Sequence, residues 1–126
     1  MITSKIYKFT DLDCWREAHS LVLDIYKITS NFPKSETFGL ASQMRRAAVS
    51  ITSNIAEGFG RTSYKEKHQF YSISRGSLIE LENQMIIARD VSYVEKIVYD
   101  KICDKIAKVS MILSGLIRST RKHQND

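Results

Sequence analysis

The sequence predicts an all-α protein, an antiparallel up-down-up-down four-helix bundle. Only one Pro and five Gly occur in 126 residues, and so few breakers favour long helices over a sheet with many turns. Apolar residues recur at helical spacing through four stretches that are joined by short connections. Short connections make consecutive helices antiparallel. We therefore expect helices at residues 11–31, 38–57, 63–89 and 93–120.

The first expected helix follows an irregular or strand-like lead-in of residues 1–10. Thr10 or Asp11 can accept hydrogen bonds from the free N–H groups of its first turn. Pro33 ends the helix, because its ring and missing N–H prevent the helix from continuing.

The second expected helix belongs to the stretch Leu40–Arg61, which has an apolar stripe and a polar stripe on its other flank. Its remaining side carries the small or apolar residues Val49, Thr52 and Ala56, so we expect it to be contacted on most sides, with a neighbouring subunit against these three. Gly58 is predicted to cap its end in the left-handed conformation.

Two further capping signals mark the third and fourth helices. Ser63 with Glu66, and Ser92 with Glu95, each have the spacing of a capping box. Gly76 interrupts the third helix without a Pro, which predicts close backbone packing at that point.

The whole chain, residues 1–126, is predicted to be one domain that ends in a frayed tail at 121–126. Cys14 and Cys103 lie in apolar-periodic segments and are expected to be buried, reduced thiols. No apolar run approaches the roughly 20 residues that span a bilayer. The beginning of the chain lacks the apolar centre of a signal peptide. We expect a cytoplasmic protein.

The residues disfavour catalysis and metal binding. The positions three before the histidines hold Arg16, Lys65 and Thr120, none a carboxylate, which argues against the Glu-x-x-His pairs of a di-iron bundle. The Gly-Phe-Gly run at 58–60 follows a helix and lacks a Lys-Ser/Thr pair, unlike a phosphate-binding loop. No nucleophile, base and acid form a set. We predict no catalytic, metal or cofactor-binding residues, and no enzyme.

Polar side chains on the second and third helices suggest a shared network. Burying either set alone would leave unpaired charges, whereas pairing them removes most of that cost. The hypothesis is an interhelical or intersubunit contact in which the second helix meets Ser77, Glu80 and Gln84; the alternative is two separate solvated faces. The network residues are Arg45, Arg46, Ser50, Asn54, Glu57, Ser77 and Glu80.

The chain is basic, with a formal net charge of +5, which permits contact with nucleic acid without requiring it. Basic residues gather on one face and at the end of the fourth helix, a pattern that fits phosphate contact. Because Asp100 and Asp104 share this helix, a plain solvated face is the alternative. The candidate nucleic-acid-binding residues are Lys101, Lys105, Lys108, Arg118, Arg121 and Lys122.

Several runs carry a family resemblance: Phe38-Gly39-Leu40, Gln43 to Ile51, Ser53 to Gly58, and Gly76-Ser77-Leu78 followed by Glu80-Leu81-Glu82. With them, the chain resembles the bacterial four-helix bundle family named for 23S ribosomal RNA intervening-sequence proteins. The family is similar in fold to the accessory variability proteins of diversity-generating retroelements, whose ring assists a reverse transcriptase and its RNA.

This resemblance implies a homopentamer with a basic surface suited to nucleic acid. The family name describes a genomic location, and its members have no established activity. The matching positions, which we interpret as structural or interface residues, are Arg45, Arg46, Ser50, Asn54, Glu57, Gly58, Ser77 and Glu80.

Taken together, these observations predict a non-enzymatic homo-oligomer that binds structured RNA or DNA, with no membrane partner and no cofactor. The alternative is a scaffold that recruits a protein partner encoded nearby, without nucleic acid.

Overall fold

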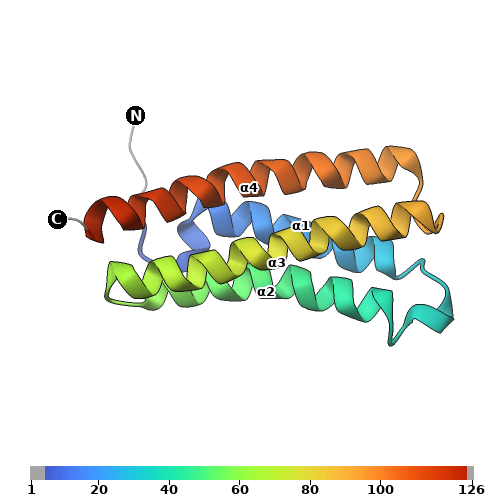
Figure 1. Cartoon of the computed structure of the whole chain (residues 1–126), viewed down its shortest axis with the longest axis horizontal. Helices are drawn as coiled ribbons and strands as arrows, with labels where there is room; N and C mark the ends of the chain where they lie inside the picture. The colour runs from blue at the N-terminus through green and yellow to red at the C-terminus, as the bar shows by residue number, and fades with distance from the viewer. Residues whose placement is uncertain (1–4, 125–126) are drawn as a thin grey trace.

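The computed structural model describes residues 5–124, with side chains up to Arg121. Within that range it contains no strand and four α-helices (Figure 1). The prediction of an all-α, antiparallel four-helix bundle is confirmed. The helices are α1 (Asp13–Thr29), α2 (Leu40–Gly60), α3 (Tyr64–Asp90) and α4 (Lys96–Gln124), with short 3-10 helices η1 (Phe9–Asp11) and η2 (Lys34–Glu36) before α1 and α2.

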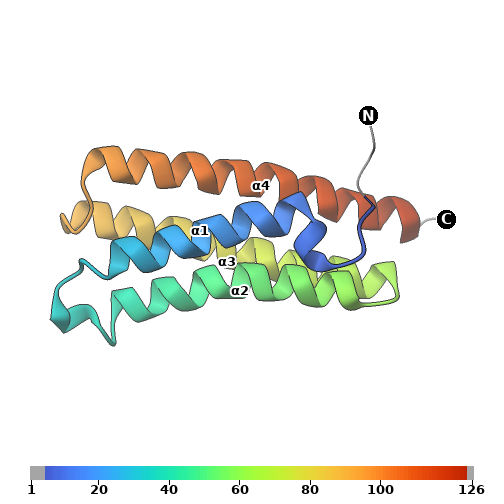
Figure 2. The same cartoon turned by 180° about the vertical axis from the view of Figure 1, so that it is seen from behind.

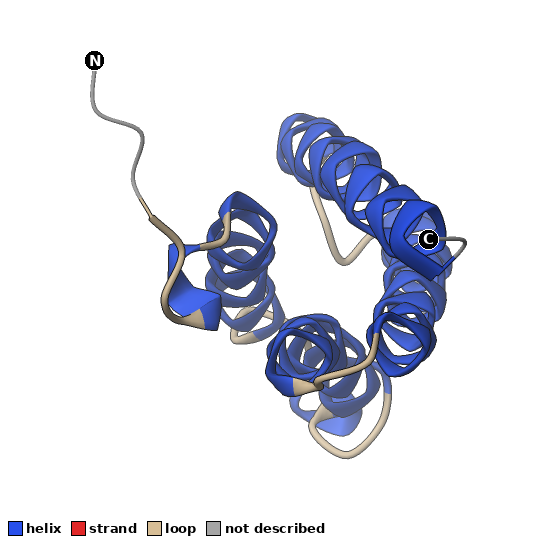
Figure 3. Ribbon diagram, turned by 90° about the vertical axis from the view of Figure 1, so that its left-hand side faces the viewer, coloured by secondary structure: helices blue, strands red, loops and turns tan. Residues whose placement is uncertain are grey.

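The helices surround the core in chain order, and each contacts its two neighbours (Figure 3). The start of α1, the α2–α3 turn and the end of α4 lie at one end of the bundle, on the left in Figure 1 and the right in Figure 2. We call this end the turn end. Cations of α3 and α4 that are far apart in the sequence therefore lie near one another.

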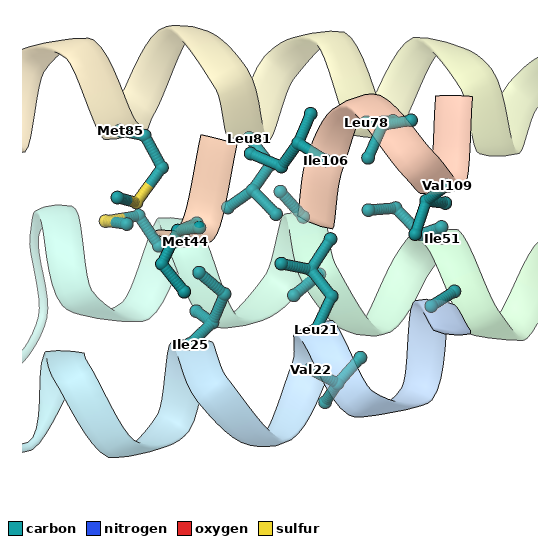
Figure 4. Packing of buried hydrophobic residues seen from close by; sticks show 14 of the residues in the cluster. Leu21, Val22, Ile25, Met44, Ile51, Leu78, Leu81, Met85, Ile106 and Val109 are labelled. Atoms are coloured by element: carbon teal, nitrogen blue, oxygen red, sulfur yellow. The ribbon is translucent and has the colours of Figure 1, made fainter. Parts of the chain in front are cut away.

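The core consists of the apolar stripes that the 3.6-residue period predicts. Leu21, Ile25 and Met44 on α1 and α2 face Leu81 and Met85 on α3 across the bundle axis (Figure 4). All five are fully buried. Burying each such side chain stabilises the fold by about 1.5–3 kcal/mol, so the four stripes hold the bundle together.

The beginning of α1 differs from the prediction. Leu12 is its N-cap residue, with no side-chain hydrogen bond. Asp11 instead accepts hydrogen bonds from the backbone N–H groups of Tyr7 and Lys8, both at 3.0 Å. These bonds hold the pKa of the Asp11 carboxyl below its usual value. The expectation that Thr10 or Asp11 caps this helix is wrong, because Asp11 is needed to close η1.

The two predicted capping boxes have different outcomes. Ser63 caps α3, and its hydroxyl accepts a hydrogen bond from the Glu66 N–H at 3.1 Å. Ser92 has φ 66°, in the left-handed region, and its N–H bonds back to the Arg89 carbonyl. The helix then begins four residues later, at Lys96. The second capping box is wrong because Ser92 belongs to the turn that ends α3.

The glycine predictions also need correction. Gly58 is not a cap: α2 continues through it to Gly60, and no described glycine has positive φ. It is buried, and a Cβ there would lie 2.5 Å from Cε1 of Tyr71. Gly76 is exposed, with nothing within 4 Å of an added Cβ, so the close packing predicted for it occurs at Gly58 instead.

Candidate nucleic-acid interface

Two of the candidate lysines on α4 pair with acids of α1. The Lys105 ammonium donates to Ser20 Oγ at 2.8 Å and pairs with the Asp24 carboxylate. Lys108 pairs with Glu17 at 3.0 Å. Both pairs cross from α4 to α1, so these cations are already neutralised by acids of the same chain. Their availability to phosphate is correspondingly reduced.

Three of the remaining candidates on α4 have no acidic partner among the described side chains. Lys101 and Arg118 are exposed and form no ion pair with any described side chain. The Arg121 Nε donates to Nε2 of His68 on α3 at 3.4 Å, so a guanidinium and an imidazole lie in contact. Lys122 lies beyond the side chains that the structure describes.

A third arginine, Arg75 of α3, lies where α3 packs against α4. We call this line of contact the seam. Arg75 lines a hollow of about 410 Å³, together with Ser114 of α4. The Arg118 guanidinium folds back toward Gly115, where an added Cβ would lie 3.6 Å from its Nη2. Arg75 is a further candidate residue that the sequence prediction did not include. Its position seven residues after His68, two turns along α3, was the available signal.

The predicted polar residues form a direct contact between α2 and α3. The hydroxyls of Ser50 and Ser77 lie 2.8 Å apart. The Asn54 amide donates to the Ser50 carbonyl at 2.8 Å and to its hydroxyl at 3.1 Å. These three side chains connect the two helices at mid-length.

The charged members of the predicted network bond elsewhere. Arg45 contacts α1, not α3: its Nε donates to Thr29 Oγ1 at 2.8 Å. Glu57 pairs with Arg61 on its own helix at 3.1 Å. Glu80 accepts a hydrogen bond from Gln84 on its own helix at 3.3 Å. The part of the hypothesis that brings Arg45 and Glu57 to α3 is therefore wrong within one chain.

Arg46 is exposed and makes no ion pair or hydrogen bond within the described part of the chain. The intersubunit alternative stays open for it.

Two interhelical bonds were not anticipated. The buried Ser74 hydroxyl donates to the backbone carbonyl of Ile51 at 2.7 Å. The Lys67 ammonium donates to the carbonyls of Gly58 and Phe59, at 3.3 and 2.7 Å. Lys67 thus satisfies the free carbonyls at the end of α2, the role that sequence reasoning gave to a glycine cap.

The outer side of α1 and α2 exposes aromatic and apolar side chains. Phe38 is 96% exposed and borders a hollow of about 590 Å³ with Tyr26, Arg46 and Val49. An exposed face of this kind is typical of an interaction surface. Thr52, which was expected to face a neighbouring subunit, is instead buried within the chain.

The described residues contain no group of three His, Cys, Asp or Glu side chains placed to hold a metal ion. Burial raises the pKa of the Cys14 thiol to about 12, so Cys14 is an unreactive core thiol. Cys103 is only half-buried, in contrast to the prediction. None of the described helices combines the length and apolar character needed to cross a bilayer.

Comparisons with known proteins agree with this architecture. A family model described as "23S rRNA-intervening sequence protein" matches residues 10–115. No curated protein matches the chain. A solved structure, a protein of unknown function from the S23 ribosomal protein family of Bacteroides thetaiotaomicron, superposes with a TM-score of 0.75 at 19% identity. The match covers 83% of this chain and 95% of that one, which supports the fold.

Proposed function

The chain belongs to the 23S rRNA-intervening sequence protein family, and from this premise we propose that it is a non-enzymatic, homopentameric helical bundle that binds structured RNA or DNA. The solved neighbour is a protein of unknown function, so the proposal depends on the chemistry of this chain's own surface.

The observation that carries the proposal is the set of cations without acidic partners. Lys101, Arg118 and Arg121 are exposed, and none forms an ion pair with a described side chain. The formal net charge is +5 per chain. Repetition around a pentamer would multiply this charge into a strong field, which attracts a polyanion.

Binding is expected to weaken steeply with salt. Cations that neutralise phosphates release counterions, so the affinity for a mixed-sequence RNA duplex should fall at least tenfold between about 50 and 200 mM salt. Fluorescence anisotropy at several salt concentrations measures this. An affinity that stays constant across that range would contradict phosphate contact.

Assembly is expected to depend on Phe38. A phenylalanine that is 96% exposed gains about 1.5–3 kcal/mol on full burial. If this face is the contact between subunits, Phe38→Ser should shift a pentamer of 14.5 kDa chains toward monomer in light scattering.

Ile97→Ser is the matched control, because it removes a side chain that is 63% exposed on α4. It should leave the mass unchanged. A wild-type protein that is monomeric at micromolar concentration would rule out the pentamer.

A scaffold that recruits a protein partner is the second candidate, and the exposed Phe38 face favours it. Three results together would support the scaffold over the nucleic-acid binder. The protein would self-associate through another face, show no affinity for duplex RNA or DNA at low salt, and capture a protein partner through Phe38.

A further inference from the structure

We infer that the nucleic-acid contact is made along the seam between α3 and α4, by a cluster of three arginines and a histidine, and not by the lysine face of α4. This inference rests on the proposed nucleic-acid binding and assigns its site. The seam cluster consists of His68, Arg75, Arg118 and Arg121.

The first argument is the division of cations between two sides of α4. On the side that faces α1, Lys105 and Lys108 have acidic partners from α1. On the side that faces α3, Arg118 and Arg121 form no ion pair with any described side chain, and neither does Arg75 of α3. A phosphate on the lysine side would have to displace a carboxylate from Lys105 and from Lys108, although Lys101 has no such partner among the described side chains. A phosphate on the seam would meet free guanidinium groups.

The second argument is the contact between Arg121 and His68. The Arg121 Nε donates to His68 Nε2 at 3.4 Å, and no acid among the described side chains bonds to either residue. This bond holds the Arg121 side chain against α3 and leaves its Nη groups for an anion. Guanidinium groups also match phosphate oxygens in a two-pronged geometry.

The third argument is spacing. His68 and Arg75 are seven residues apart on α3, about 10 Å along the helix at 1.5 Å per residue. Contact between Arg121 and His68 places Arg121 at the His68 level. The Arg118 guanidinium lies toward Gly115, the residue after Ser114, which lines the same hollow as Arg75. About 10 Å corresponds to roughly three base-pair steps measured along the axis of a B-form duplex.

One acid borders the seam cluster. Glu82 lines the same hollow as Arg75 but forms no ion pair with it. It lies seven residues beyond Arg75, past the mid-length of α3. The cluster itself lies toward the turn end. Contacts to phosphate carry no sequence information, so binding should be indifferent to base sequence.

The test compares two triple variants with equal loss of charge in the full chain. The seam variant is Arg75→Gln, Arg118→Gln, Arg121→Gln. The control is Lys5→Gln, Lys27→Gln, Lys34→Gln, which removes three exposed cations without ion pairs among the described side chains. The probe is a mixed-sequence RNA duplex, titrated at several salt concentrations.

In the seam variant, the slope of log affinity against log salt should fall by about 0.9 for each lost contact, and binding at 0.1 M salt should weaken on the order of 100-fold. The control should bind within a few-fold of wild type. A second seam variant with lysine at the three positions keeps the charge and should retain most of the slope. Circular dichroism of each variant checks the fold.

The outcomes separate the site from the function. If both triple variants lose RNA affinity equally, or if the control loses more, the seam assignment is wrong and nucleic-acid binding is unaffected by that result. A wild-type protein that ignores the duplex at 50 mM salt would overturn both. If only the glutamine seam variant loses RNA affinity and the lysine seam variant still binds, the result supports the seam assignment.

Discussion

Gly58→Val is expected to destabilise the fold by about 3 kcal/mol and to lower Tm on the order of 10 °C, because overpacking of a tight core site costs this much. A Cβ at Gly58 would lie 2.5 Å from Cε1 and 2.7 Å from Cδ1 of Tyr71. The Tyr71 ring is 3% exposed and cannot rotate into solvent. Thermal unfolding followed by circular dichroism, at fixed protein concentration, measures the change.

Gly60→Val is the matched control for this variant. Gly60 is the last residue of α2 and is exposed, and an added Cβ would meet nothing within 4 Å. Its effect should stay within about 0.5 kcal/mol. If both variants melted at the wild-type temperature, the close approach of α2 to Tyr71 would be wrong.

Leu81→Ala is expected to cost about 2–5 kcal/mol, the range for a leucine removed from a packed core. Leu81 is fully buried on α3 and lies among the core residues of the other helices (Figure 4). The loss combines lost burial with the cavity that remains. Urea unfolding gives the free energy of unfolding.

Ile79→Ala provides the comparison on the same helix. Ile79 is 61% exposed, so the free energy of unfolding should change by less than about 0.5 kcal/mol. Similar losses for the two variants would mean that α3 buries a different stripe from the one that contains Leu81.

The helices were predictable because their signals are local. Each signal determines the conformation of residues close to it in the sequence. These signals are the 3.6-residue apolar period, the single Pro and the Ser63–Glu66 spacing. The second capping box failed for the same reason. A serine three residues before a glutamate is compatible with a helix start, but the turn that closes α3 places Ser92 at φ 66°.

The candidate site was less predictable because it depends on which charges meet. Periodicity placed Lys101, Lys105 and Lys108 on one face of α4, and this grouping was reasonable. Whether each lysine is free depends on acids more than 80 residues earlier in the chain. Arg75 presents a different case: its spacing from His68 places both residues on one face of α3, but only the packed structure shows that this face meets α4.

The sequence by itself determined the number of helices, their approximate limits and the stripe that each one buries, because these follow from local spacing and from burial of apolar area. Only the tertiary structure decided which cations remain free, which glycine is a close-packing site and which polar groups join helices. Those properties depend on distances between residues of different helices, and such distances exist only once the helices pack.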